Sequence, residues 1–394
     1  MQDYKLTRSS PFRPGIRVNT NDFVGHEELI MDMIKRVNPL LEGEVVSYYI
    51  VGNRGMGKSS LSYYFSEILE KKFEIIPIHI SNEGVSDLNT LIVQIIETLL
   101  NEISDKKWSK KILDFFGENV ESVGFLNFSF KLKPKSDDYI ESLVRHFDKF
   151  IKDILDSIED SNGLLIIIDD VNGLSENPDF ANWFRRIYHE LTFKYNNEIP
   201  LAFIITSFPE NLNQLQVHNE SFSRLFNHFD LSYLSMEDVK KFYKNKFSSV
   251  EIGINDEVLD LISKYSYGMP LMMQEIGESI YWLCDESKYI DLSLALTGIK
   301  EANRRIYSKY LNPIVIDDNY TYILEIISDN INGDDMTSFD INDFKDNLNN
   351  EEKTVLDIFL EIAIGNQVIT KINQTNRFKF NNPLYAIYLK INKL

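Results

Sequence analysis

Short runs of apolar residues alternate with longer helical stretches along the first half of the chain. The apolar runs have the length of strands and lie at residues 45–51, 73–80, 164–168 and 201–206. Residues 58–71 contain no Pro or Gly and predict a helix, and residues 87–102 predict a long amphipathic helix. This alternation predicts an α/β fold with a parallel sheet that helices cover on both faces.

The segment between the second and third strands is long, and we interpret residues 103–140 as an insertion on this domain. Within the insertion, residues 106–116 are helical in pattern and residues 125–132 alternate like a strand. A further short strand is expected at 228–234. Ser235 and the two acids that follow Met236 then begin a helix in the manner of a capped N-terminus.

The second half of the chain is mainly helical. Apolar residues recur at helical spacing over four stretches that predict a helical lid, at 236–247, 256–265, 271–283 and 292–310. From residue 313 the pattern predicts helices near 320–328 and 351–364 and a hairpin at 367–380, an order typical of a winged helix. We therefore expect three domains, at 1–235, 236–312 and 313–394.

The charge of the chain is strongly acidic and unevenly distributed. It has 41 Lys and Arg against 60 Asp and Glu, a net charge of −19, which disfavours wholesale binding to nucleic acid or to an anionic membrane. Residues 317–361 carry thirteen acids and two lysines, whereas residues 366–394 carry five basic side chains and no acid. DNA binding by this chain would therefore have to use the basic residues of 366–394.

Apolar content and cysteine usage favour a cytoplasmic protein with real hydrophobic cores. Hydrophobic residues make up 43% of the chain, and no apolar run approaches the roughly 20 residues of a membrane span. The single cysteine, Cys284, cannot form an intramolecular disulfide and lies in an apolar helix, so we interpret it as a packing residue. We also expect no signal segment at Met1.

A Gly-rich motif follows the first predicted strand. Residues 52–59, Gly-Asn-Arg-Gly-Met-Gly-Lys-Ser, fit the pattern G-x-x-x-x-G-K-[ST] and open the next predicted helix, which is the context of a P-loop. The glycines let successive backbone N–H groups point at phosphate oxygens. Lys58 is expected to neutralise the β and γ oxygens of ATP, and Ser59 to bind Mg²⁺.

Two other strands end in polar side chains at the same edge of the predicted sheet. Asp169 and Asp170 follow the apolar run 164–168, and Asp169 is expected to hold Mg²⁺ directly or through water. Asp170 either orients the attacking water or caps the following turn. Thr206 and Ser207 end the fourth strand and are candidates for the γ-phosphate or the water if that strand lies between the other two.

Arginine residues supply candidates for a finger that reaches a neighbouring subunit's nucleotide. Arg224 precedes the last core strand and is the first candidate, with a solvated surface arginine as the alternative. Arg185 and Arg186, beside Trp183, are rival candidates. The six histidines are dispersed without the spacing of a zinc site.

Several spaced motifs together resemble AAA+-related P-loop ATPases near the origin-recognition group, the archaeal-type ATPases and the STAND class of signal-transduction ATPases. Residues 23–29 (FVGHEEL) are similar to the family's box upstream of the P-loop, with His26 where Arg is usual, and residues 10–15 look like its leading segment. Residues 268–271 (GMPL) resemble the G-x-P motif of the lid, and residues 382–389 the closing segment of the winged helix.

The resemblance implies a nucleotide site assembled from these motifs. Phe23 and Val24 are implied contacts to adenine, Gly25 permits the turn, and Pro270 approaches the base. The implied nucleotide-binding set is completed by the P-loop residues Gly52, Asn53, Arg54, Gly55, Met56, Gly57, Lys58, Ser59 and Ser60.

Two departures from the family pattern favour a switch over a fast motor. Asp170 stands where most members have a catalytic glutamate, and it is shorter by one methylene. Leu271, Met272 and Met273 stand where many lids place a sensor arginine. Both changes suggest slow hydrolysis of ATP held between core and lid.

Four functions remain open at this point. The first is an ATP- and Mg²⁺-dependent switch that controls self-assembly or a separately encoded protein partner, a role that such proteins play in signalling or in defence against mobile elements. The second is a DNA-binding replication initiator or transposition-type ATPase that uses the basic residues Lys371, Arg377, Lys379, Lys390 and Lys393. A small-molecule kinase and a non-catalytic scaffold are less favoured.

Overall fold

The computed structural model describes residues 9–82, 84–104, 120–123, 129–132, 137–156, 161–196, 198–284, 288–311, 320–331, 337–372 and 375–394. The chain divides into two compact units. The first, which we call the core unit, comprises Val18–Gly52 and Gly57–Ser232. The second, the helical unit, comprises the chain up to Arg17, Asn53–Met56 and Tyr233–Leu394. The division into three domains stays a prediction.

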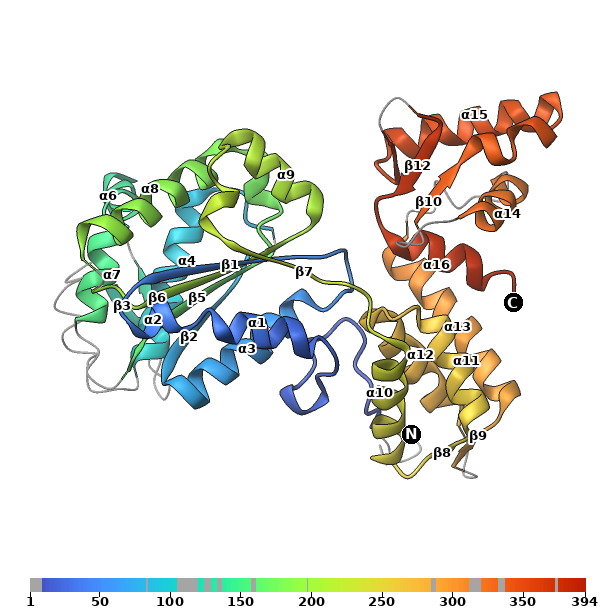
Figure 1. Ribbon diagram of the computed structural model, residues 1–394, viewed down its shortest axis with the longest axis horizontal. Coiled ribbons are helices and arrows are strands. Elements are labelled where there is room, and N and C mark those ends of the chain that lie inside the picture. The colour runs from blue at the N-terminus through green and yellow to red at the C-terminus, as the bar shows by residue number, and fades with distance from the viewer. Residues whose placement is uncertain are drawn as a thin grey trace. The chain divides into compact units, whose positions relative to one another are not determined.

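A parallel five-stranded sheet forms the centre of the core unit (Figure 1). The strand order is β2-β5-β6-β1-β7. The strands are β1 (Val45–Val51), β2 (Ile75–Ser81), β5 (Gly163–Asp169), β6 (Leu201–Ser207) and β7 (Asn227–Asp230). The apolar side chains of β1, β5 and β6 are buried from both faces, which is why the sequence shows continuous apolar runs there rather than alternation. The predicted α/β fold is confirmed.

In the core sheet, two strand boundaries differ from the prediction by more than one residue, and the backbone explains the first. The predicted second strand begins two residues later because α3 (Lys58–Phe73) continues to Phe73 and Glu74 then takes a left-handed conformation, φ 57°. The last strand ends at Asp230 rather than at residue 234.

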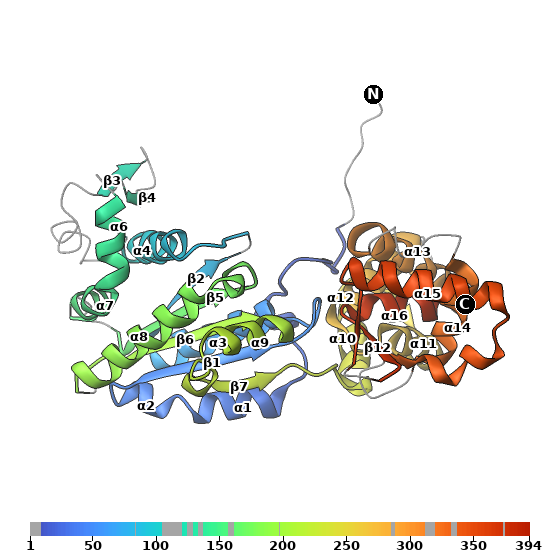
Figure 2. The ribbon, with the colours of Figure 1, turned by 90° about the horizontal axis from the view of Figure 1, so that it is seen from above.

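Helices cover both faces of this sheet (Figure 2). On one face, α4 (Leu88–Ser104), α7 (Phe147–Leu155) and α8 (Pro178–Lys194) share one buried apolar cluster with side chains of β1, β2, β5 and β6. The other face is covered by α3 and by α1 (Glu27–Lys35). The remaining elements of the core unit are α2 (Asn38–Leu41), α6 (Asp137–Arg145), α9 (Pro209–His218) and the 3-10 turns η1 (Thr20–Asp22), η3 (Gly173–Glu176) and η4 (Ser223–Leu225).

Part of the predicted insertion is described. β3 (Val120–Val123) pairs antiparallel with β4 (Ser129–Leu132), which falls within the strand expected at 125–132. The helix expected at 106–116 lies outside the described residues.

The helical unit contains the predicted lid helices. They are α10 (Met236–Ser248), α11 (Asp256–Ser266), α12 (Pro270–Leu283) and α13 (Leu292–Tyr310), with a short parallel pair, β8 (Gly253–Ile254) and β9 (Tyr289–Ile290). The Ser235 hydroxyl accepts the N–H of Asp238 at 3.1 Å, which is the expected cap of α10. α13 continues through Gly298, the residue that weakens the helical pattern in the sequence. A Cβ at this position would lie 2.3 Å from Ile280, so glycine permits close packing of α12 and α13.

Residues near the chain start also belong to the helical unit. The Phe12 ring is buried against Phe242 and Phe247, at centroid distances of 5.9 and 5.0 Å. A Cβ on Gly277 of α12 would lie 2.2 Å from this ring, so glycine is what lets the aromatic ring approach the helix. The backbone of Arg13 then donates to the Gln274 side chain at 2.8 Å.

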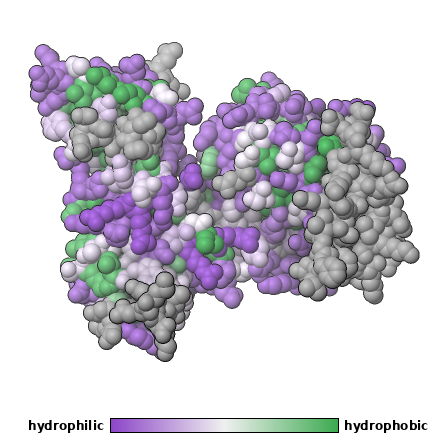
Figure 3. All heavy atoms as spheres, turned by 180° about the vertical axis from the view of Figure 1, so that it is seen from behind, coloured by the Kyte–Doolittle hydropathy of each residue, from purple (hydrophilic) through white to green (hydrophobic). Residues whose placement is uncertain are grey.

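The C-terminal part joins three helices to a three-stranded antiparallel sheet of order β10-β12-β11. Its elements are α14 (Thr321–Asn330), β10 (Ser338–Asp340), η6 (Ile341–Asp343), η7 (Lys345–Asn347), α15 (Asn350–Gly365), β11 (Ile369–Lys371), β12 (Arg377–Phe380) and α16 (Pro383–Ile391). The predicted hairpin at 367–380 is therefore confirmed. Hydrophobic residues reach the surface of this part (Figure 3, upper left). Among the described residues, no helix has both the length and the apolar character needed to cross a membrane.

Candidate functional site

The Gly-rich loop connects β1 to α3. Gly55 and Gly57 have φ of 81° and 91°, a left-handed backbone that residues with a Cβ rarely adopt. α3 begins at Lys58 directly after the second of these glycines, so its first N–H groups face the loop. The local sequence thus forms a strand, a tight turn and an open helix N-terminus, the geometry that binds phosphate.

The side chains after the glycines differ in what they contact. The Lys58 ammonium donates to the Gly52 carbonyl at 2.7 Å and lies 4.3 Å from the centroid of the Phe208 ring, so it crosses the loop. Ser59 is exposed on the first turn of α3. The Ser60 hydroxyl accepts the N–H of Val18 at 3.3 Å, which ties the chain upstream of the sheet to this helix.

Strand β6 lies between β1 and β5. This order meets the condition on which the roles expected for Thr206 and Ser207, at the end of β6, depend. Thr206 is fully buried, and its hydroxyl donates to the Asp169 carboxylate at 2.6 Å. The same oxygen accepts the backbone N–H of Asp170 at 2.9 Å. Thr206 therefore fixes the orientation of Asp169.

Asp170 has a left-handed backbone, φ 69°, which is uncommon for a residue with a side chain. Its carboxylate accepts the backbone N–H of Asn172 at 3.2 Å, and its carbonyl accepts from the Asn82 side chain at 3.1 Å. Of the two roles that the sequence left open, the capping of the following turn is the one this geometry displays.

Ser207 contributes to the core of the sheet. Its hydroxyl is fully buried, accepts from the Tyr49 hydroxyl at 2.9 Å and donates to the Phe208 carbonyl at 2.8 Å. Burial raises the pKa of Tyr49 well above its usual value, so the phenol stays a neutral donor. We therefore leave Ser207 out of the proposed site.

The residues implied near adenine form a compact turn before α1. The Phe23 ring stacks on Tyr64 of α3 at a centroid distance of 4.5 Å, and Val24 is half-buried. Gly25 and His26 both have positive φ, 76° and 59°, and α1 begins immediately afterwards. This turn thus lies beside the helix that follows the P-loop.

The tip of the P-loop belongs to the helical unit. Pro270 is the first residue of α12, and the backbone N–H of Leu271 donates to the Gly55 carbonyl at 3.1 Å. A Cβ on Gly55 would lie 2.8 Å from the Leu271 side chain, and Arg54 lies 5.7 Å from the Tyr310 ring centroid. The sequence motif indicated Pro270 but missed Leu271, which is the residue in contact with the loop.

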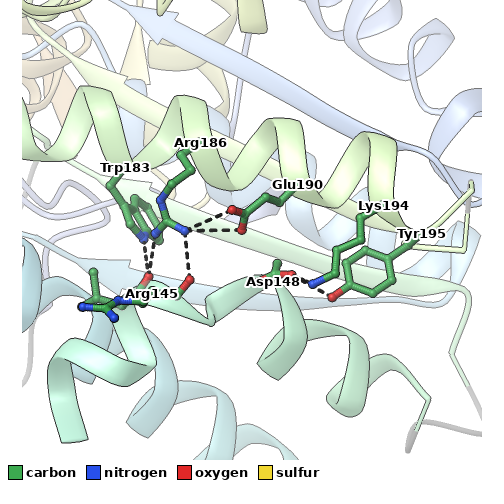
Figure 4. A network of polar contacts seen from close by, with 8 residues as sticks. Arg145, Asp148, Trp183, Arg186, Glu190, Lys194 and Tyr195 are labelled. Atoms are coloured by element: carbon green, nitrogen blue, oxygen red, sulfur yellow. Dashed lines mark hydrogen bonds and ion pairs between the residues drawn. The ribbon is translucent and has the colours of Figure 1, made fainter. Parts of the chain in front are cut away.

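The three candidate arginines gather on one surface of the core unit. Arg185 and Arg186 of α8 and Arg224 of η4 line the same groove. The Arg186 guanidinium is bound by the carbonyls of Val144 and Arg145 at 3.0 and 2.9 Å and by Glu190, as Figure 4 shows. Arg186 therefore caps the end of α6, whereas Arg185 and Arg224 are exposed.

The donor set at the edge of the sheet suits Mg²⁺. A serine hydroxyl and an aspartate carboxylate supply the hard oxygen ligands that Mg²⁺ prefers, and in nucleotide sites the remaining ligands are phosphates and waters. Among the residues that the structure describes, no cluster of three or more His, Cys, Asp or Glu could hold a metal on its own. Ser59 and Asp169 are thus the side chains that would hold Mg²⁺ here.

The sheet order, the P-loop after β1 and the aspartate at the end of β5 are those of a P-loop α/β core. The structure is similar over nearly its whole length to the Walker-type ATPase PABY2304 of Pyrococcus abyssi, with a TM-score of 0.55, 17% identity and coverage of 98% of this chain and 99% of that one. The ORC2 protein of Aeropyrum pernix, solved with ADPNP and ADP, gives a TM-score of 0.54 at 12% identity, covering 97% and 95%.

A third similar structure is Cdc6p of Pyrobaculum aerophilum, with a TM-score of 0.50, 14% identity and coverage of 97% and 96%. The resemblance expected from the motifs is thus confirmed in the fold, which this chain shares with archaeal Walker-type ATPases and origin-recognition proteins. No protein-family model and no curated protein matches the chain.

Proposed function

We propose that the chain binds ATP with Mg²⁺ at its P-loop, hydrolyses it slowly, and acts as a nucleotide-dependent switch that controls self-assembly or a separately encoded partner. The main support for this proposal is that β1, β6 and β5 are neighbours in the sheet. The Thr206 hydroxyl at the end of β6 donates to the Asp169 carboxylate at 2.6 Å, beside the strand that leads into the P-loop. The similar ORC2 structure, solved with ADPNP and ADP, supports a nucleotide as the ligand.

The residues of the site divide the work. The N–H groups of the loop and of the first turn of α3 would bind the phosphates, and Lys58 would exchange the Gly52 carbonyl for phosphate oxygens. Ser59 and Asp169 would hold Mg²⁺, which supplies charge neutralisation at the phosphates when bound. Phe23 and Val24 would contact the adenine.

Slow turnover follows from the state of Asp170. A general base must reach the attacking water, but the Asp170 carboxylate accepts the N–H of Asn172 and sits on a strained left-handed residue. To orient water, it would have to leave this turn. We propose that a neighbouring subunit or partner supplies that rearrangement, so that hydrolysis depends on assembly.

The test is ATP turnover measured over a range of protein concentrations, beside Lys58→Ala and the matched control Lys72→Ala, which removes an exposed lysine near the far end of α3. Specific activity should rise with concentration and vanish in Lys58→Ala alone. Bound nucleotide should likewise be lost only from Lys58→Ala. Tight ATP binding by this variant would refute the proposal.

DNA binding through the C-terminal hairpin is a second candidate. Lys371 and Arg377 are exposed on β11 and β12. Lys393, however, pairs with Asp329 and the Glu325 carbonyl of α14, and Lys390 donates to the Ile331 carbonyl. Fewer basic side chains are therefore available than the sequence count indicates. Duplex binding at low salt that weakens steeply as salt rises, and that is lost in Lys371→Ala/Arg377→Ala, would favour this function.

A further inference from the structure

One groove on the core unit is basic although the chain as a whole carries a net charge of −19. Its volume is about 480 Å³, and it lies along α8 and the segment before β7. We call it the arginine groove and define it by its lining residues, Arg185, Arg186, Tyr188, His189, Glu190, Phe193, Ser221, Arg224 and Leu225. Three arginines face one carboxylate there.

Two of the three arginines in the arginine groove are not neutralised by a carboxylate within it. Arg186 and Glu190 bind each other at 3.3 Å, so the one carboxylate among the described lining residues is already neutralised (Figure 4). Arg185 and Arg224 are exposed, and within the described part of the chain neither has a hydrogen bond or ion pair. The groove therefore presents two unpaired guanidinium groups, which are suited to carboxylates.

An apolar anchor lies beside these cations. Phe193 is 70% exposed, an unusual fraction for so large an apolar side chain, and its ring lies 4.5 Å from that of His189. Aromatic and arginine side chains together are the composition of interface centres. The ligand expected from this surface is thus both acidic and apolar, as an amphipathic helix is, rather than a bare phosphate backbone.

The chain itself carries such a helix. On α15, Asp357, Ile358, Glu361 and Ile364 are exposed together, and we call these four residues the acidic face of α15. The two isoleucines are 45% and 44% exposed and stand one turn before and after Glu361. Asp357 pairs with Lys345 at 3.1 Å, while Glu361 has no ion pair among the described residues. A carboxylate between two apolar anchors complements a groove that is lined by an exposed ring and two unpaired guanidinium groups.

We propose that the arginine groove of one copy of this chain receives the acidic face of α15 of a second copy. Arg185 and Arg224 bind Asp357 and Glu361, and the isoleucines cover Phe193. The argument for this interface does not rest on the proposed ATPase activity. It assigns Arg224 to a carboxylate of the second copy rather than to a phosphate group.

Charge reversal on each side tests the proposal with the full chain. Arg185→Glu/Arg224→Glu makes the groove acidic, and Asp357→Arg/Glu361→Arg makes the helix face basic, so that each variant alone brings like charges together. Lys72→Glu/Lys300→Glu is the matched control for the groove variant, since both replace two positive side chains by two negative ones, and the control does so at exposed sites outside both surfaces. Thermal melting verifies that all variants stay folded, and light scattering after gel filtration gives the mass.

The expected result is a wild-type mass above that of the monomer, rising with concentration. Each double variant alone should associate at least about tenfold more weakly, whereas the control should not change. An equal mixture of the two variants should associate again, because each mutated surface then meets one of opposite charge.

Four results would overturn the proposal. The first is a wild-type protein that stays monomeric at low salt, and the second is a mixture that fails to associate. The third is loss of ATP turnover in Arg224→Ala at unchanged mass, which would give this arginine to nucleotide instead. Binding of single-stranded nucleic acid that is lost with Arg185 and Arg224 while the mass is unchanged would likewise replace the second copy as occupant.

Discussion

Replacing Thr206 with valine should destabilise the core unit and also free the side chain of Asp169, the proposed Mg²⁺ ligand. Valine keeps the volume of the buried side chain but removes the hydroxyl that donates to Asp169 at 2.6 Å and accepts from the Asp170 N–H at 2.9 Å. Nothing else in the described surroundings of Thr206 needs to move. The change is therefore a test of two hydrogen bonds rather than of packing.

The magnitude follows from those two bonds. A hydrogen bond to a charged group contributes about 1.5–3 kcal/mol, and a buried N–H left without an acceptor costs about 1–3 kcal/mol. Because Asp169 is only half-buried, water compensates part of the first loss, and we expect about 3 kcal/mol in total. For a unit of this size that corresponds to a decrease in Tm of roughly 6–12 °C.

Thr206→Ser is the control, because it keeps the hydroxyl and deletes one methyl group, at a cost of about 1 kcal/mol. Melting is measured without nucleotide or metal, and Mg²⁺-dependent ATP binding separately by calorimetry. The loss of the group that orients Asp169 should weaken Mg²⁺-dependent binding by about 10–100-fold in the valine variant alone. If the valine and serine variants melt together and bind alike, the role assigned to the hydroxyl is wrong.

Three further perturbations address the rest of the molecule. Phe12→Ala should destabilise the helical unit by about 3–5 kcal/mol in urea unfolding, because it empties a fully buried aromatic site; unchanged stability would show that the N-terminal segment is not anchored there. Gly55→Ala should weaken ATP binding, since the new Cβ meets Leu271 at 2.8 Å on a left-handed backbone, whereas the exposed Gly365→Ala should not; equal affinities would contradict this account of the loop. Asp148 is a pH test: burial opposes its charge, but hydrogen bonds from Lys194 and Tyr195 outweigh burial and lower its pKa from 3.8. The stability it adds is therefore present above about pH 4 and lost as pH falls through the lower folded-state pKa, so the difference in unfolding free energy from Asp148→Asn should shrink in acid. A difference independent of pH would refute the assignment.

The loop and strand ends of the proposed nucleotide site could be predicted from the sequence, because short stretches of sequence determine their geometry. A left-handed turn requires glycine, an open helix N-terminus follows it, and a buried strand delivers Asp169, so residues 52–59 and 164–169 carry their own geometry. The position of β6 between β1 and β5 could be stated only as a condition. It depends on which strands pair, and pairing is set by packing across the whole sheet.

The contacts that modify this site could not be predicted. Asp170 has the same neighbours in sequence whether it orients water or caps a turn, and the Thr206 hydroxyl and the Asn82 side chain that bind its backbone are distant in sequence. Leu271 reaches Gly55 across more than two hundred residues of sequence. The grouping of Arg185 with Arg224 arises in the same way from helix packing, and neither arginine carries a local signal of it.

The packing of Phe12 against α10 and α12 makes the core unit, in chain order, an insertion within the helical unit. During synthesis the N-terminal segment that carries Phe12 emerges early. Its packing partners Phe242 and Phe247 emerge only after Ser232 has completed the core unit. The core unit can therefore fold on the ribosome first, before residues 9–17 have their packing partners. A fragment that starts at Tyr233 would lack the Phe12 ring that packs on α10 and α12. A stable helical unit therefore has to be built by joining residues 9–17 to that fragment through a short linker.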